Sequence, residues 1–111
     1  MAYLSLSAMK TKMVEKAQRK LAYSFDDYAF DKELLGDYFD EACSIIKDWK
    51  KKSDYNFLFN GNYDTNIVRY IIESVNYAGL EGQSSSSANG NAKIFIGTPE
   101  SNLKKSIPQS I

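Results

Sequence analysis

The stretch DKELLGDYFDEACSIIKDW, residues 31–49, decides the fold class. Its apolar side chains recur at spacings of three and four, which predicts a helix with one broad buried face. Asp31 is a favourable N-cap, Phe30 before it can pack on Leu35, and the lysines at 50–52 suit the carbonyl end of a helix. The apolar face consists of Leu34, Leu35, Tyr38, Phe39, Ala42, Ile45, Ile46 and Trp49. We expect this segment to be the core helix of an all-α protein.

A first helix is predicted upstream, with Ser5 or Ser7 as its cap. Residues 22–30 interrupt its helical period, which predicts a loop with aromatic anchors. The apolar stripe of this helix consists of Met9, Met13, Val14, Ala17 and Leu21. The opposite side carries a basic stripe, defined as Lys12, Lys16, Arg19 and Lys20.

A third helix is predicted downstream, capped by Asn62 or Asp64 and stopped by Gly79 or Gly82. Its stripe consists of Ile67, Val68, Ile71, Ile72, Val75 and Ala78, and Arg69 can pair with Glu73 on its surface. The loop at 53–62 is too aromatic for a free linker, so we expect it to cover one end of the bundle. The predicted core residues are Leu35, Phe39, Ile46, Trp49, Ile71 and Val75.

The composition changes after the third helix. Residues 82–92 are rich in Gly, Ser and Asn, which predicts a flexible loop, and the β-prone triplet Ile94, Phe95 and Ile96 follows. Thr98 and Pro99 begin a short last helix with Leu103 and Ile107 as its apolar contacts. Residues 93–107 either pack back on their own domain or dock on a neighbouring molecule. We therefore predict one domain, a three- to four-helix bundle at 1–81 followed by a flexible loop and a C-terminal docking segment at 82–111.

The composition argues against catalysis. The chain holds no histidine, and its one cysteine, Cys43, is predicted to be a small buried hydrophobic residue. Asp26, Asp27 and Asp31 lack the spacing of a calcium loop, so we expect no metal and no cofactor. Nothing resembles a signal peptide or a long apolar span, which favours a reducing cytoplasmic origin and no membrane partner.

The charges are balanced in number but segregated along the chain, with 14 basic and 14 acidic residues. Opposite the apolar face of the second helix lies an acidic stripe, defined as Asp37, Asp40, Glu41 and Asp48. This stripe is either a solvated face or an acidic surface that meets a partner, such as the basic stripe of another copy.

The order of these parts resembles the head–tail connector family (adaptor or head-completion proteins) of long-tailed bacteriophages. The resemblance is carried by DKELLxxYFxxA from residue 31, by YAGLEGQSSS at 77–86 and by Thr98-Pro99, and it spans roughly residues 5–107. The aromatic loop at 53–62 and the short element after Pro99 depart from the family pattern.

The resemblance implies a structural virion protein that forms a ring, commonly dodecameric, between the capsid portal and the tail. Its partners would be other copies of itself, the portal protein and a tail-side stopper or tail-completion protein, with DNA passing through without sequence-specific binding. It would be assembled in the cytoplasm of the bacterial host and reside at the head–tail interface of the virion. The candidate interface residues are Lys12, Lys16, Asp37, Asp40, Glu41, Asp48, Ile94, Phe95 and Ile96.

The alternative is a small nucleic-acid-binding regulatory protein that uses the basic stripe on DNA phosphates. The zero net charge and the missing recognition-helix pattern argue against it.

Overall fold

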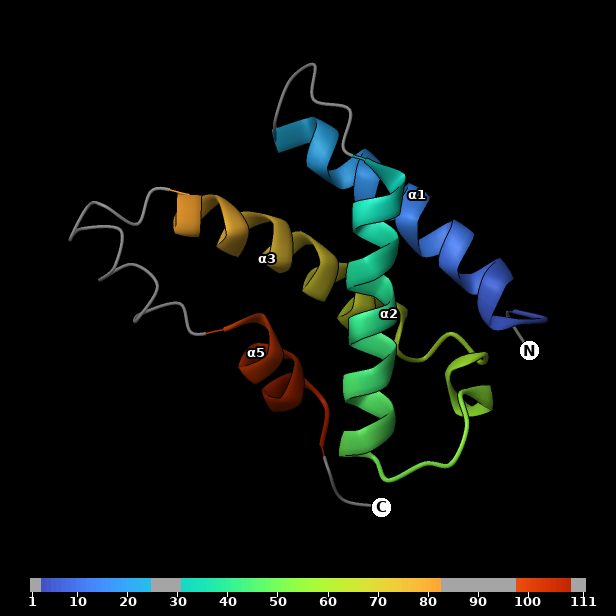
Figure 1. The fold of residues 1–111 in the computed structure, drawn as a ribbon. Coiled ribbons are helices and arrows are strands. Elements are labelled where there is room, and N and C mark those ends of the chain that lie inside the picture. The colour runs from blue at the N-terminus through green and yellow to red at the C-terminus, as the bar shows by residue number, and fades with distance from the viewer. Residues whose placement is uncertain (1–2, 25–30, 83–97, 109–111) are drawn as a thin grey trace.

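The computed structural model describes residues 3–24, 31–82 and 98–108. Within these ranges the chain forms four α-helices and no strand, which confirms the predicted all-α fold (Figure 1). The elements are α1 (Leu6–Ser24), α2 (Lys32–Trp49), the 3₁₀ helix η1 (Asn56–Leu58), α3 (Asp64–Gly82) and α5 (Pro99–Ser106).

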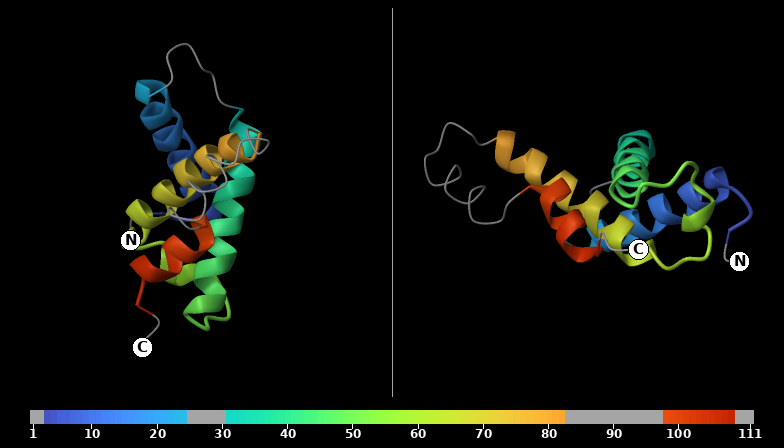
Figure 2. Two further views of the ribbon diagram at one scale, coloured as in Figure 1. Left: turned by 90° about the vertical axis from the view of Figure 1, so that its left-hand side faces the viewer. Right: turned by 90° about the horizontal axis from the view of Figure 1, so that it is seen from below.

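The bundle has two layers. Helices α1, α3 and α5 lie in one layer and α2 lies across one face of it (Figure 2). Helices α1, α2 and α3 contact one another, and α5 packs on α3 and α2. None of the helices in the described ranges is both long and apolar enough to cross a membrane.

Helix α1 begins where its sequence predicts. The Ser5 hydroxyl accepts a hydrogen bond of 3.1 Å from the Ala8 amide, so Ser5 rather than Ser7 is the cap. The predicted stripe of Met9, Met13, Val14, Ala17 and Leu21 is buried. The helix continues to Ser24, so the prediction that the loop starts at residue 22 is wrong. Residues 22–24 contain no Gly or Pro that would end the helix. Residues 25–30, including Phe30, lie outside the described ranges.

Helix α2 also has the predicted cap, since the Asp31 carboxylate accepts from the Glu33 amide at 2.9 Å. Gly36 is buried where α1 crosses α2, and the aliphatic stem of Lys10 lies directly on it. A Cβ at this position would lie 2.9 Å from Lys10 Cε. Gly36 therefore allows the Lys10 side chain its close approach to α2.

The aromatic loop closes one end of the bundle, as predicted. Leu58 and Phe59 are buried, and the Phe59 carbonyl accepts a hydrogen bond of 3.0 Å from the Tyr3 amide. The Tyr3 hydroxyl donates to the Asp64 carboxylate. Helix α3 begins at Asp64 itself, so Tyr63 occupies the cap position and the prediction of a cap at Asn62 or Asp64 is wrong.

The core prediction holds for four of its six residues. Leu35, Phe39, Ile46 and Ile71 are fully buried, whereas Trp49 and Val75 are only partly buried. Trp49 is the last residue of α2 and hydrogen-bonds to Ile107 at the end of α5, and Val75 lies in the C-terminal half of α3. Ala78, one turn further along α3, is exposed.

Helix α5 packs back on its own bundle. The Thr98 hydroxyl accepts from the Ser101 amide at 3.1 Å, Pro99 is the first helical residue, and Leu103 and Ile107 are buried. Two alternatives were predicted for this segment, packing on its own domain and docking on a neighbouring molecule. Residues 99–107 pack on their own domain. The loop at 83–92 and the triplet Ile94, Phe95 and Ile96 lie outside the described ranges.

Candidate functional site

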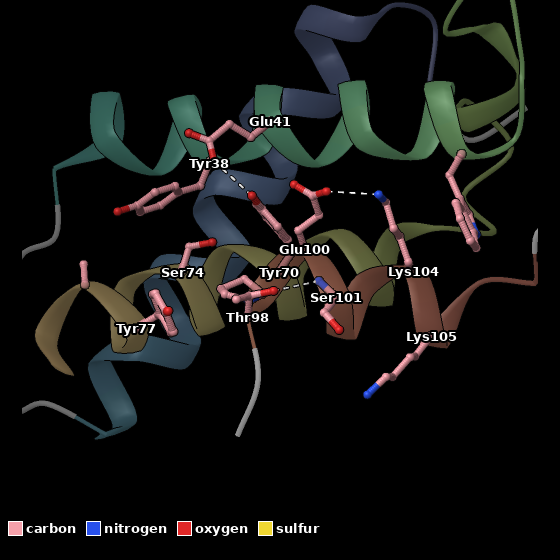
Figure 3. A pocket seen from close by; sticks show the side chains of 13 residues that line it. Tyr38, Glu41, Tyr70, Ser74, Tyr77, Thr98, Glu100, Ser101, Lys104 and Lys105 are labelled. Carbon is pink, nitrogen blue, oxygen red and sulfur yellow. Dashed lines mark hydrogen bonds and ion pairs between the residues drawn. The ribbon is translucent and has the colours of Figure 1, made fainter. Parts of the chain in front are cut away.

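Helices α2, α3 and α5 enclose an open groove of about 790 Å³ (Figure 3). Its lining combines tyrosine hydroxyls, an indole ring and charged groups: Tyr38, Glu41, Trp49, Tyr70, Ser74, Tyr77, Ala78, Thr98, Pro99, Glu100, Ser101, Lys104 and Lys105. Ala78 and Thr98 lie close to the two ends of the chain segment that joins α3 to α5. The groove is therefore a concave feature built by elements that are distant in sequence.

The wall from α3 is a stripe that the sequence interpretation missed. Tyr70, Ser74 and Tyr77 recur at spacings of four and three, parallel to the apolar stripe of the same helix. Tyr70 and Ser74 are buried and Tyr77 is half-buried, so this stripe forms the boundary between the core and the groove.

Tyr70 joins α3 to α2 across the groove. Its hydroxyl donates a hydrogen bond of 2.9 Å to Glu41 Oε1 (Figure 3). Burial, followed by the hydrogen bond to Glu41, raises the pKa of Tyr70 above its ordinary value of 10.0, so the phenol remains a donor at neutral pH. Glu41, one of the candidate interface acids, is thus engaged within its own chain.

The wall from α5 is held by polar contacts. Lys104 Nζ lies 3.0 Å from Glu100 Oε2 and 5.4 Å from the centre of the Trp49 ring. Trp49 Nε1 donates to the Ile107 carbonyl at 2.8 Å.

A further contact ties α5 to α3. Asn102 Nδ2 donates to Glu73 Oε2 at 3.0 Å, so Glu73, which the sequence paired with Arg69, makes its hydrogen bond to α5. These bonds fix α5 as a wall of the groove.

The groove offers aromatic surface and hydroxyl donors. Among the residues that the structure describes, no group of His, Cys, Asp or Glu is placed to hold a metal ion. Cys43 is buried in the core, as predicted, and burial, followed by the charge of Asp40, raises the pKa of its thiol to about 12. Both the Tyr70 phenol and this thiol are protonated at neutral pH, and the groove presents hydrogen-bond donors and aromatic rings.

The predicted charged stripes occupy the surfaces of α1 and α2. Lys12, Arg19 and Lys20 are exposed on α1 and Lys16 is half-buried, while Asp37 and Asp48 are exposed on α2. Asp40 lies 3.0 Å from Lys10 Nζ in a largely exposed ion pair, the kind that contributes about 0–1 kcal/mol. Lys12, Asp37 and Asp48 are therefore accessible for contact with another molecule. Asp40 and Glu41 already have partners in the same chain.

No protein-family model, curated protein or solved structure matches the chain. The resemblance to the connector family consequently stays a prediction from the residues quoted for it.

Proposed function

We propose that this protein is a structural subunit of a bacteriophage head–tail connector, which assembles as a ring between the capsid portal and the tail and lets DNA pass through. The support is the order of elements: a capped first helix, the DKELL core helix, a third helix and a Thr-Pro-initiated last helix. In this proposal the protein has no catalytic role, and it acts at the head–tail interface of the virion with the portal and a tail-side protein as partners.

The observation that carries the proposal is the separation of exposed charge between two crossing helices. A cyclic ring needs a heterologous contact, in which one surface of each copy meets a different surface of the next. The exposed lysines of α1 and the exposed aspartates of α2 supply two such surfaces of opposite sign. Charge complementarity of this kind sets orientation and accelerates encounter.

Charge reversal tests this interface. The variant Asp37→Lys/Asp48→Lys should fail to form rings on portal assemblies encoded in the same phage genome, because lysines would then face lysines. Adding Lys12→Glu and Lys16→Glu should restore ring formation by reversing both sides. Sedimentation of the mixture measures the outcome.

The matched control is Glu15→Lys/Glu33→Lys, which reverses two exposed acids outside the acidic stripe. It should assemble like the parent. If the Asp37/Asp48 variant assembles normally while DNA exit slows, the acidic stripe lines the channel; if neither changes, it is a solvated face and the interface hypothesis fails.

A further inference from the structure

A second concentration of charge lies at the C-terminal ends of α2 and α5, outside both stripes. We call it the lysine end and define it as Lys47, Lys50, Lys51, Lys52, Lys104 and Lys105. Lys50 Nζ donates to the Pro108 carbonyl at 3.0 Å, which brings the two helix ends together. The nearby acids are Asp48, Asp54 and Glu100, so the lysines outnumber them, and Asp54 and Glu100 are already hydrogen-bonded to Asn56 and Lys104.

One residue at the lysine end, Lys51, has a backbone conformation that favours glycine. Lys52 N donates to the Lys47 carbonyl at 2.9 Å and Lys51 N to the Asp48 carbonyl at 3.2 Å, which is the pattern of a Schellman cap. Lys51 occupies the left-handed position of this cap, with φ of 56°. Glycine is the favoured residue there, so the backbone conformation gives no reason for a lysine, although its charge suits the carbonyl end of α2. The positive charge of Lys51, which is exposed, points to a use outside the chain.

The aromatic rings at this end are covered by ammonium groups. Lys47 Nζ lies 5.4 Å from the Tyr55 ring centre, Lys52 Nζ lies 5.8 Å from that of Phe57, and Lys104 covers Trp49. The surface therefore presents charge rather than exposed apolar side chains. The proposed ring contact pairs lysines with aspartates, whereas the lysine end has an excess of lysines, which suits a polyanion such as a phosphate backbone.

We propose that the lysine end binds the phosphate backbone of double-stranded DNA without sequence preference. Lysine ammonium groups act as point charges toward phosphates, and phosphate contacts carry no sequence information. The binding needs one copy of the chain only, so it does not rest on ring formation. It also differs from the regulatory alternative, which would use the basic stripe of α1.

The test is fluorescence anisotropy with a labelled duplex of about 30 base pairs, titrated from low to physiological salt. For four to five phosphates neutralised, the logarithm of the binding constant should fall with the logarithm of salt at a slope of about −4. Lys51→Gly should weaken binding several-fold at low salt and make the slope shallower by about one. Its urea midpoint should be no lower than that of the parent, because glycine suits the cap, so misfolding cannot explain the loss.

The matched comparison removes two lysine charges from the lysine end in one variant and two from the basic stripe of α1 in another. Lys51→Gly/Lys105→Gln should lose more affinity than Lys51→Gly alone, whereas Lys12→Gln/Lys20→Gln on α1 should bind like the parent. The proposal is overturned if the parent does not bind the duplex at low salt, or if the α1 variant loses as much affinity as the lysine-end variant. Preferential binding to phosphatidylglycerol vesicles, with little binding to duplex, would likewise overturn it and indicate a membrane surface.

Discussion

At the scale of single residues, Gly36 shows how a side chain of α1 is accommodated on α2. Glycine inside a helix costs about 1 kcal/mol relative to alanine, yet Gly36 stands in the second turn of α2. The space that its missing Cβ leaves is occupied by the Lys10 stem on its way to Asp40. Because the obstructing atom belongs to a flexible and exposed lysine, the glycine is replaceable when Lys10 is shortened.

We expect Gly36→Ala to change the free energy of unfolding little in the parent, since the gain in helix propensity is offset by displacement of Lys10. In the Lys10→Ala background the same substitution should stabilise by about 1 kcal/mol. Urea denaturation of the four variants in this double-mutant cycle measures the difference. Equal effects in both backgrounds would show that Lys10 does not limit the space at Gly36.

Trp49 and Phe39 should differ in their contribution to stability, because one is partly and the other fully buried. Phe39→Ala should cost about 3–5 kcal/mol, and Trp49→Ala should cost less. Trp49→Phe keeps a ring but removes the donor to Ile107, so it should cost about 0.5–1.5 kcal/mol. A Trp49→Ala cost equal to that of Phe39→Ala in urea unfolding would mean that Trp49 belongs to the core after all.

Cys43 should make stability depend on pH on the alkaline side. Its thiol pKa is about 12 in the fold against 9.0 ordinarily, so the unfolded chain releases this proton first as pH rises. The stabilisation is present in full below about pH 9 and is lost progressively between about pH 9 and 12. The difference in urea midpoint between the parent and Cys43→Ala should therefore shift against the parent from about pH 8 to about pH 11. An unchanged difference would contradict the burial of the thiol.

At the scale of elements, α5 is the least anchored helix. It has eight residues, too few to be stable alone, and its buried apolar contacts are Leu103 and Ile107. Side-chain hydrogen bonds from Trp49, Asn66 and Asn102 complete its attachment. Such an element can open locally without unfolding the bundle.

Leu103→Ala should release α5 while the other helices stay folded, because α1, α2 and α3 contact one another independently of α5. Amide exchange should become fast in α5 and stay slow at Leu35, Phe39 and Ile46 in α2. Loss of protection in both helices together would show that α5 and the bundle unfold as one cooperative unit. Lys105→Ala, which alters an exposed position of the same helix, is the control.

The elements were predictable to the extent that their signals are local. Asp31 and Thr98 cap their helices as predicted, because a cap depends on neighbouring residues alone. The partial exposure of Trp49 and Val75 was not predictable, because helical period does not show how far a helix extends past its neighbours. The end of α1 at Ser24 was not predicted. The aromatic residues in this part of the sequence interrupt the helical spacing of the apolar side chains, and this interruption was interpreted as the end of the helix.

At the scale of the whole molecule, the candidate surfaces differ in how far they could be predicted from the sequence. The charged stripes follow from helical spacing, so the exposure of Lys12, Asp37 and Asp48 was predictable. The groove was not, because its walls come from three helices whose packing no local pattern encodes. The engagement of Glu41 by Tyr70 and of Asp40 by Lys10 likewise appears only when the helices are assembled.

The central claim is that copies of this chain form a ring on a phage portal. The most direct measurement is electron microscopy of purified portal assemblies from the same phage genome, mixed with an excess of this protein. The connector proposal predicts an added ring of density on the tail-facing side of the portal, with the rotational symmetry of the portal. Portal particles that remain unchanged in shape and mass at saturating concentrations of a folded protein would contradict it.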